Sequence, residues 1–253
     1  MESVSNPGRP ARIAMWSGPR NISTAMLRAF EARGDCAVTD EPLYAFYLDR
    51  TGLEHPGREA ILASQARDWR AVAEALTGPV PDDQPVWYQK HMAHHLLPEV
   101  GAEWLDDLRH GFLIREPEAM LTSLLQVLPE PRLEDTGLPQ QVALFDRFAA
   151  TGETPPVVDS RDVLLDPPGM LAALCERFGI AYTEHMLTWA PGRRATDGVW
   201  AEHWYASVER STGFAPYTEK QDRVPEHLEP LLEQCRPLYA HLAAHRLQSR
   251  TDA

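Results

Sequence analysis

The segment 18–24 (GPRNIST) carries residue types that bind phosphate groups. It follows the apolar run 12–16 and precedes a helical pattern. A strand that turns through small and hydroxyl residues into a helix points free backbone N–H groups and a positive dipole end at one spot. That spot attracts an anion, and Arg20 and the hydroxyl groups of Ser23 and Thr24 are placed to contact it.

The segment is not a Walker A loop. Ser23 and Thr24 stand where GxxxxGK[ST] has its second glycine and its lysine, which removes the usual point charge on a nucleotide γ-phosphate. The pattern that remains favours a loop that holds one terminal phosphate with backbone groups, hydroxyls and Arg20. An ordinary strand-to-helix turn, capped by Ser23 or Thr24, explains the segment alone at least as well.

A second pattern for binding an anion follows the expected strand 111–114. Arg115 stands at the C-terminal end of this strand, and Ser123 lies eight residues later, two turns into the helix expected after it. Two side chains in this arrangement can converge on one anion at the carboxyl edge of a parallel sheet.

Candidates for a general base follow two other expected strands. Lys90 closes the apolar run 86–89, and His91 comes directly after it. Imidazole titrates near neutral pH and is the commonest general base, which favours His91. Glu41 follows the expected strand 36–39 and is the rival base, although a carboxylate at a strand end can equally be an exposed turn residue or the partner of an arginine.

Two more histidines, His94 and His95, make a cluster with His91. Such a cluster at a helix start is more often a surface or capping feature than a catalytic one. A metal site is disfavoured, because only His91 and His95 share a helical face and no nearby carboxylate at ligand spacing completes the set.

The elements that must position these residues alternate along the chain. Runs rich in β-branched or aromatic residues alternate with helical patterns, which predicts an α/β fold with three layers and a doubly wound parallel sheet. The expected strands are 11–17, 36–39, 86–89, 111–114 and 156–158. The expected helices are 22–33, 58–76, 117–128, 138–149, 168–178 and 225–245. The segment 188–217 lacks a steady period and is expected to be a functional loop with a short helix around 201–210.

Length and charge narrow the function classes. The chain has 253 residues, 43% of them hydrophobic, and a formal net charge of −13. This composition suits a globular enzyme, and so acidic a chain is not expected to bind nucleic acid or an anionic membrane. Without an apolar run that could cross a bilayer or an apolar signal peptide, the expected location is cytoplasmic. We expect one domain over 12–246, with tails at 1–11 and 247–253.

Taken in chain order, these patterns resemble sulfotransferases that use 3′-phosphoadenosine-5′-phosphosulfate (PAPS). The spacing of Arg115, Pro117 and Ser123 resembles the family's 3′-phosphate pattern. The stretch 19–24 resembles the bacterial PRSGST form of the family's 5′-phosphosulfate loop, with Ile22 where that loop usually has a glycine.

A third match lies in the segment 193–204, which is similar to the family's RKGxxGxWxxxF segment. Arg193 and Arg194 replace its Arg-Lys pair, and Gly198 and Trp200 are in register. In the family this segment closes over the nucleotide and adds cations to its 3′-phosphate. The matches span residues 12–204, about three quarters of the chain.

The resemblance implies a P-loop NTPase-like sulfotransferase fold, PAPS as co-substrate, no metal and a small-molecule acceptor, and it leaves a homodimer open. Contacts to PAPS are then expected from one set of residues: Arg20, Asn21, Ile22, Ser23, Thr24, Ala25, Arg115, Ser123, Arg193, Arg194 and Trp200.

Sulfuryl transfer resembles phosphoryl transfer, because it needs neutralised charge on the transferred group and a base for the acceptor proton. Arg20 and Lys90 are expected to neutralise the charge on the sulfuryl group and the bridging oxygen. The stretch 90–98 resembles the family's KTHLP strand end, so His91 is the expected base, with His94 and Glu41 as alternatives.

Two other functions stay open at this point. One is a non-catalytic relative that keeps the fold and binds a nucleotide or a protein partner. The other is a P-loop kinase of small metabolites, which the missing Walker lysine disfavours.

Overall fold

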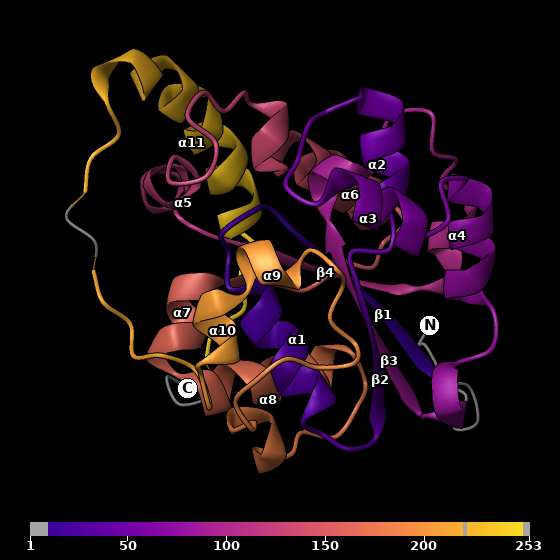
Figure 1. The fold of residues 1–253 in the computed structure, drawn as a ribbon. Helices are drawn as coiled ribbons and strands as arrows, with labels where there is room; N and C mark the ends of the chain where they lie inside the picture. The colour runs from indigo at the N-terminus through magenta and orange to yellow at the C-terminus, as the bar shows by residue number, and fades with distance from the viewer. Residues whose placement is uncertain (1–9, 220–221, 250–253) are drawn as a thin grey trace.

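The computed structural model describes residues 10–219 and 222–249, and its centre is a five-stranded sheet (Figure 1). The strands are β1 (Ala11–Ser17), β2 (Cys36–Asp40), β3 (Val86–Met92), β4 (Arg109–Ile114) and β5 (Val157–Asp159). They are all parallel, in the order β2-β3-β1-β4-β5. The order reverses beside β1, so the carboxyl end of β1 is the switch point where such sheets bind ligands.

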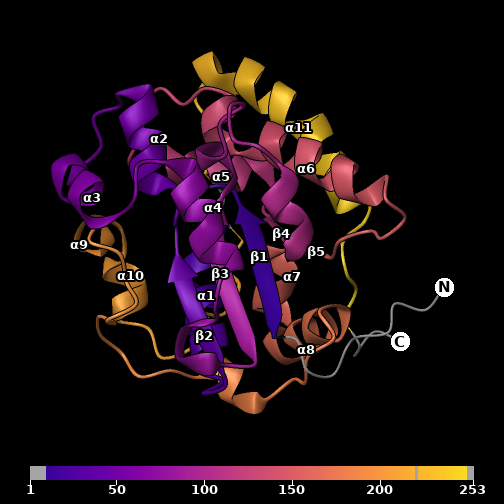
Figure 2. The ribbon, with the colours of Figure 1, turned by 90° about the vertical axis from the view of Figure 1, so that its right-hand side faces the viewer.

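Helices cover both faces of the sheet, which confirms the predicted doubly wound α/β fold. Figure 1 shows α1 (Ser23–Glu31) and α8 (Pro167–Arg177) on one side of the sheet and α4 (Trp69–Thr77) on the other. Helices α6 (Leu138–Ala149) and α11 (Glu229–Ala243) lie side by side on the same face as α4 (Figure 2).

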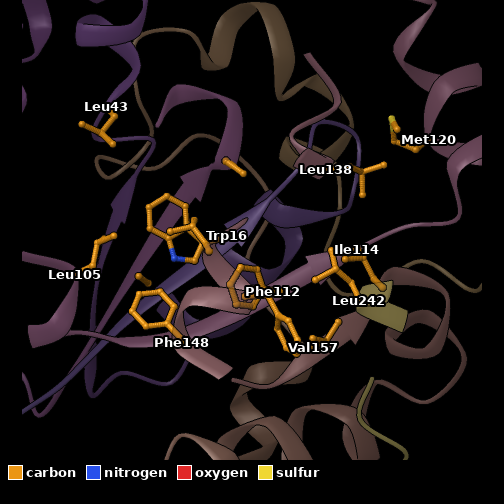
Figure 3. Packing of buried hydrophobic residues seen from close by; sticks show 14 of the residues in the cluster. Trp16, Leu43, Leu105, Phe112, Ile114, Met120, Leu138, Phe148, Val157 and Leu242 are labelled. Atoms are coloured by element: carbon orange, nitrogen blue, oxygen red, sulfur yellow. The ribbon is translucent and has the colours of Figure 1, made fainter. Parts of the chain in front are cut away.

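The side chains of β1 alternate between the two faces, as the pleat of a strand requires. Ile13 and Met15 pack against α1 and α8, whereas Trp16 joins the cluster under α4, α6 and α11. Figure 3 shows Trp16, Phe112 and Phe148 in that cluster. Trp16 and Phe112 are fully buried, so close packing of the core fixes the carboxyl ends of β1 and β4 in position.

The prediction of a single helix over 58–76 is wrong, because the structure has two helices there, α3 (Arg58–Ser64) and α4. Gln65 between them is extended, and its side chain donates a hydrogen bond to the Glu41 carbonyl oxygen (3.1 Å). Asp68 then begins α4 as its N-cap. A long-range contact therefore interrupts a helical pattern.

Other helices also differ from the sequence-based prediction. Two were not predicted, α2 (Tyr44–Thr51) and α7 (Ser160–Leu165), and α5 (Pro117–Leu124) ends earlier than expected. The segment 188–217 holds α9 (Ala201–Trp204) and α10 (Ala206–Glu209), close to the one short helix that was expected.

The expected tails fall mainly on residues 1–9 and 250–253, which lie outside the described residues. Strand β1 already begins at Ala11, and the Leu247 backbone N–H donates to the Val157 carbonyl oxygen (2.8 Å). Of the helices in the described ranges, none has the length and apolar character that a membrane crossing needs.

A buried ion pair fixes the segment 188–217 to α1. Two N–O contacts of 2.6 and 2.7 Å join the Arg28 guanidinium to the Asp197 carboxylate, and both side chains are almost completely buried. The same carboxylate accepts a hydrogen bond from the Arg194 backbone N–H (2.7 Å). Asp197 therefore attaches the segment 188–217 to α1 and also stabilises the turn between Arg194 and Asp197.

Replacing Asp197 by asparagine is expected to lower the free energy of unfolding by about 3 kcal/mol, because Arg28 stays buried without a counter-charge. Urea denaturation measures the change. Glu99→Gln is the matched control, since Glu99 and Arg50 form an exposed pair worth about 0–1 kcal/mol. Equal losses in the two variants would contradict the anchoring role of Asp197.

Candidate active site

A cavity of about 700 Å³ opens at the carboxyl end of the sheet. Its wall is formed by the β1–α1 loop, the ends of β3 and β4, helices α2 and α5 with the segments that follow them, and residues of the segment 188–217 from Trp204 onward. This is the switch point of the sheet, and the volume lies in the range of small-molecule sites. Most of the residues predicted from the sequence to do chemistry line this cavity.

The β1–α1 loop has an uncommon backbone. Arg20 (φ 63°) and Ile22 (φ 58°) both lie in the left-handed region. For a β-branched residue such as Ile22 this conformation is strained by about 1–3 kcal/mol. The loop is fixed all the same, because the Asn21 side-chain amide donates to the Leu113 carbonyl oxygen (3.2 Å).

The first turn of α1 faces the cavity. Ser23, Thr24 and Ala25 line it, and no side chain caps the helix. The first backbone N–H groups and the positive end of the helix dipole therefore remain available to an anion.

The structure brings Arg115 and Ser123 to the same cavity, as their spacing predicts, and it places Arg20 between them. The Arg20 Nε donates to the Ser123 Oγ (3.0 Å), and the Arg115 Nη1 donates to the Arg20 carbonyl oxygen (2.6 Å). Burial and the nearby Arg20 lower the pKa of Arg115. Neither guanidinium forms an ion pair with a carboxylate in the described part of the chain, so two cations and a hydroxyl group are free to bind an anion.

Arg193, Arg194 and Trp200 lie away from these cations. Arg194 lines a separate cavity of about 400 Å³ against α1, with its Nε 3.5 Å from the Glu31 carboxylate, and Arg193 is exposed. The Trp200 ring is buried edge-on against Tyr44, with 5.2 Å between centroids, so it anchors the segment. Only residues from Trp204 onward carry this segment into the large cavity.

Lys90 is buried at the end of β3 in a network of charged and hydroxyl groups. Its Nζ lies 2.8 Å from the Asp40 Oδ1 and 2.5 Å from the Glu41 Oε1, and it donates to the Tyr205 hydroxyl (2.9 Å). The Tyr205 hydroxyl in turn donates to the Asp40 Oδ2 (2.6 Å). Burial alone would lower the pKa of Lys90, but Asp40 and Glu41 raise it well above its usual value, so the ammonium stays charged.

Asp40 was missed as a member of the site, and the contact of Tyr205 with Lys90 was not predicted. The pairing of β2 with β3 places Asp40 directly beside Lys90, and a sheet order derived from the sequence could have shown this. Nothing in the local sequence around Tyr205 indicates this contact, because 115 residues separate it from Lys90.

Glu41 lines the cavity from a fixed position. Its backbone is left-handed (φ 42°), and its N–H donates to the Lys90 carbonyl oxygen (2.9 Å). Burial raises the pKa of Glu41 and Asp40 raises it further, while Lys90 acts in the opposite direction. A carboxylate that binds a proton more readily than usual, at the wall of a cavity, has the properties of a general base.

His91 does not reach the cavity. Its ring stacks on Trp16 at 4.4 Å between centroids, and its Nε2 lies 3.3 Å from the Gln89 Oε1 in the core. Burial lowers the pKa of His91 to about 3. The reason is that β3 continues to Met92 instead of ending at Gln89, so Lys90 and His91 point to opposite faces of the sheet.

His94 and His95 line the cavity beside α2 and contact aromatic rings. Tyr44 and Tyr47 stack on His95 at 4.6 and 4.7 Å, and Tyr47 meets the edge of His94 at 5.4 Å. Burial lowers the pKa of His94 to about 4 and that of His95 well below its usual value. In the described ranges no group of three or more His, Cys, Asp or Glu side chains could hold a metal ion.

Acid is expected to destabilise the fold through its buried histidines. Burial lowers the pKa of each of them, so the folded state stays neutral where the unfolded chain takes up protons, and stability that is complete above pH 7 is lost as the pH falls. Between pH 7 and 5.5 the loss is about 1 kcal/mol for each histidine. The histidines concerned are His91, His94, His95 and His110.

Chemical denaturation across this pH range measures the loss. His91→Gln should reduce the loss between pH 7 and 5.5 by about 1 kcal/mol, whereas a change at the exposed His227 should not reduce it. A free energy of unfolding that does not change with pH would rule out this description of the core.

Comparisons with known proteins bear on what this cavity does. The family model that matches, described as a sulfotransferase domain, covers residues 11–246. The branched-chain-amino-acid aminotransferase-like proteins 2 and 1 of Arabidopsis thaliana are 32% and 34% identical over 234 and 237 residues. These matches cover 92% and 93% of this chain but 41% and 42% of the relatives, so the chain spans about two fifths of their length.

A solved structure supports the fold. The sulfotransferase from Alicyclobacillus acidocaldarius is similar at a TM-score of 0.56, with 16% identity over 95% of this chain and 97% of that one. At this identity the likeness is one of fold, and it agrees with the parallel sheet described above.

Proposed function

Because this chain belongs to the sulfotransferase domain family, we propose that it transfers a sulfuryl group from PAPS to a hydroxyl or amino group of a small-molecule acceptor. One observation carries the proposal. A single cavity holds both a free anion site, formed by Arg20, Arg115 and Ser123, and the buried carboxyl group of Glu41. A cytoplasmic location is part of the same proposal and rests on the sequence composition.

The described residues suit a 3′-phosphonucleotide. The open N–H groups of α1 and the Arg20 guanidinium would hold the 5′-phosphosulfate, and Arg115 with Ser123 would hold the 3′-phosphate. PAPS supplies the sulfuryl group and its phosphate leaving group. The missing Walker lysine and the paired guanidinium sites favour this ligand over a nucleoside triphosphate.

Glu41 is the base that the geometry supports best. It lines the cavity, its raised pKa favours proton uptake, and Lys90 fixes the position of its carboxyl group. Lys90 is held between Asp40, Glu41 and Tyr205, so its role in this proposal is to orient the base. Arg20 is then the side chain that neutralises charge on the transferred group.

Arg115→Ala is expected to weaken binding of adenosine 3′,5′-bisphosphate by about 2–4 kcal/mol, because a charge-assisted contact is lost from a partly buried site. Calorimetry measures the affinity. AMP is the matched control ligand, since it lacks the 3′-phosphate and its affinity should hardly change. If both ligands weaken equally, Arg115 does not bind the 3′-phosphate.

Glu41→Gln is expected to lower kcat by roughly two to four orders of magnitude, with little change in bisphosphate affinity, because a general base acts in the transition state. His91→Gln should leave kcat within about threefold, since His91 lies in the core. Labelled sulfate transfer measures both rates. If His91→Gln lowers kcat strongly and Glu41→Gln does not, His91 is the base and Glu41 is not.

A further inference from the structure

Positively and negatively charged side chains of the cavity wall follow different helices and strands. The cations without a carboxylate partner, Arg20 and Arg115, follow β1 and β4. Two carboxylates that follow other elements, Glu54 after α2 and Glu130 after α5, have no ion-pair partner within residues 10–219 and 222–249. The wall is therefore positive where phosphates would bind and negative where it is built by the segments after α2 and α5.

The remaining cations of the wall are already neutralised. The Arg132 Nη2 lies 3.3 Å from the Asp135 Oδ1, and the Arg132 backbone N–H donates to the same carboxylate (2.8 Å). Lys90 is shared between Asp40 and Glu41. An acceptor that carries a carboxylate or phosphate would thus lose water without gaining a free cation beside it.

Aromatic and imidazole rings form the wall beside these carboxylates. Tyr44 and Tyr47 enclose His95, and the Tyr44 hydroxyl hydrogen-bonds the His55 Nδ1 (2.8 Å). His55 follows Glu54 directly in the chain, which places these rings beside that carboxylate. Burial lowers the pKa of His55 and raises the pKa of both tyrosines, so the rings add no charge near neutral pH.

A further part of the wall is apolar. Leu124, Val127 and Leu128 line the cavity directly after Ser123, and Val127 is 42% exposed. An exposed large apolar side chain beside other apolar side chains in a cavity suits the hydrocarbon part of a ligand.

We infer that the acceptor is a cationic alcohol or phenol, with a protonated amine that binds at the Glu54 and Glu130 carboxylates and a hydroxyl group that meets Glu41. This inference rests on the proposed function and names its substrate class. The two carboxylates, which have no ion-pair partner among the described residues, balance the charge of the ammonium group. The ammonium has no lone pair, so the hydroxyl group is the nucleophile.

The transfer balances with groups already named. The acceptor hydroxyl oxygen forms a bond to sulfur while the bond from sulfur to the bisphosphate oxygen breaks. The hydroxyl proton passes to Glu41, and adenosine 3′,5′-bisphosphate leaves with the electron pair of the broken bond. The amine keeps its proton throughout.

Three phenols of similar shape test the substrate class: 4-(2-aminoethyl)phenol, 4-ethylphenol and 4-hydroxyphenylacetate. Calorimetry on protein saturated with adenosine 3′,5′-bisphosphate gives their dissociation constants, and transfer of labelled sulfate gives kcat/KM. We expect the amine to bind about tenfold more tightly than the neutral phenol, and the carboxylate about tenfold more weakly. Raised salt should reduce the difference.

Two variants separate the cavity carboxylates from the overall charge. Glu130→Gln should remove several-fold of the advantage of the amine and leave the affinity of 4-ethylphenol unchanged. Glu99→Gln changes the net charge equally, but Glu99 does not line the cavity, so the advantage should persist.

Other results would overturn the substrate class. They are equal affinities for the three phenols, tightest binding of the carboxylate, no binding of any of them, or an unchanged preference in Glu130→Gln. Each of these is compatible with a sulfotransferase of another specificity. Failure of the protein to bind the bisphosphate would instead contradict the proposed function.

Discussion

The arrangement of the site depends on the buried Lys90 ammonium and on the polar groups that contact it. Taking the Lys90 ammonium out of water is costly unless carboxylates and hydroxyl groups surround it, and Asp40, Glu41 and Tyr205 do so from three parts of the chain. The same contacts tie β2 and β3 to the segment 188–217. Burial and the neighbouring Asp40 charge raise the pKa of Glu41, and Lys90 acts in the opposite direction, so Glu41 keeps a raised affinity for protons.

The anion site differs from the surroundings of Lys90, because its cations have no ion-pair partner among the described residues. Arg20 and Arg115 lie close together and form no ion pair with a carboxylate of the described residues, and Ile22 holds a strained backbone between β1 and α1. Buried core residues under β1 and β4 keep this arrangement in place, and an anion bound there would relieve the repulsion between the two guanidinium groups. In the proposed function, contacts within the protein hold Glu41 in place as the base, whereas the ligand would complete the anion site.

Much of the fold and part of the site could be predicted from the sequence. Alternating patterns and strand-end residues are local, so the parallel sheet, the β1–α1 loop and the position of Arg115 and Ser123 in one cavity follow from them. The position of His91 could not be predicted, because three more residues in β3 decide which face of the sheet it occupies. The contact of Tyr205 with Lys90 and the pairing of Arg194 with Glu31 depend on tertiary packing that leaves no local pattern.

The central claim is that burial and the neighbouring Asp40 charge outweigh the attraction of Lys90, so that Glu41 remains able to accept a proton. Carbon-13 NMR of labelled carboxyl groups, with Glu41→Gln to assign the signal, measures this directly. The account predicts that the Glu41 carboxyl group titrates above the ordinary range of glutamate. Titration of Glu41 at or below that range would contradict it.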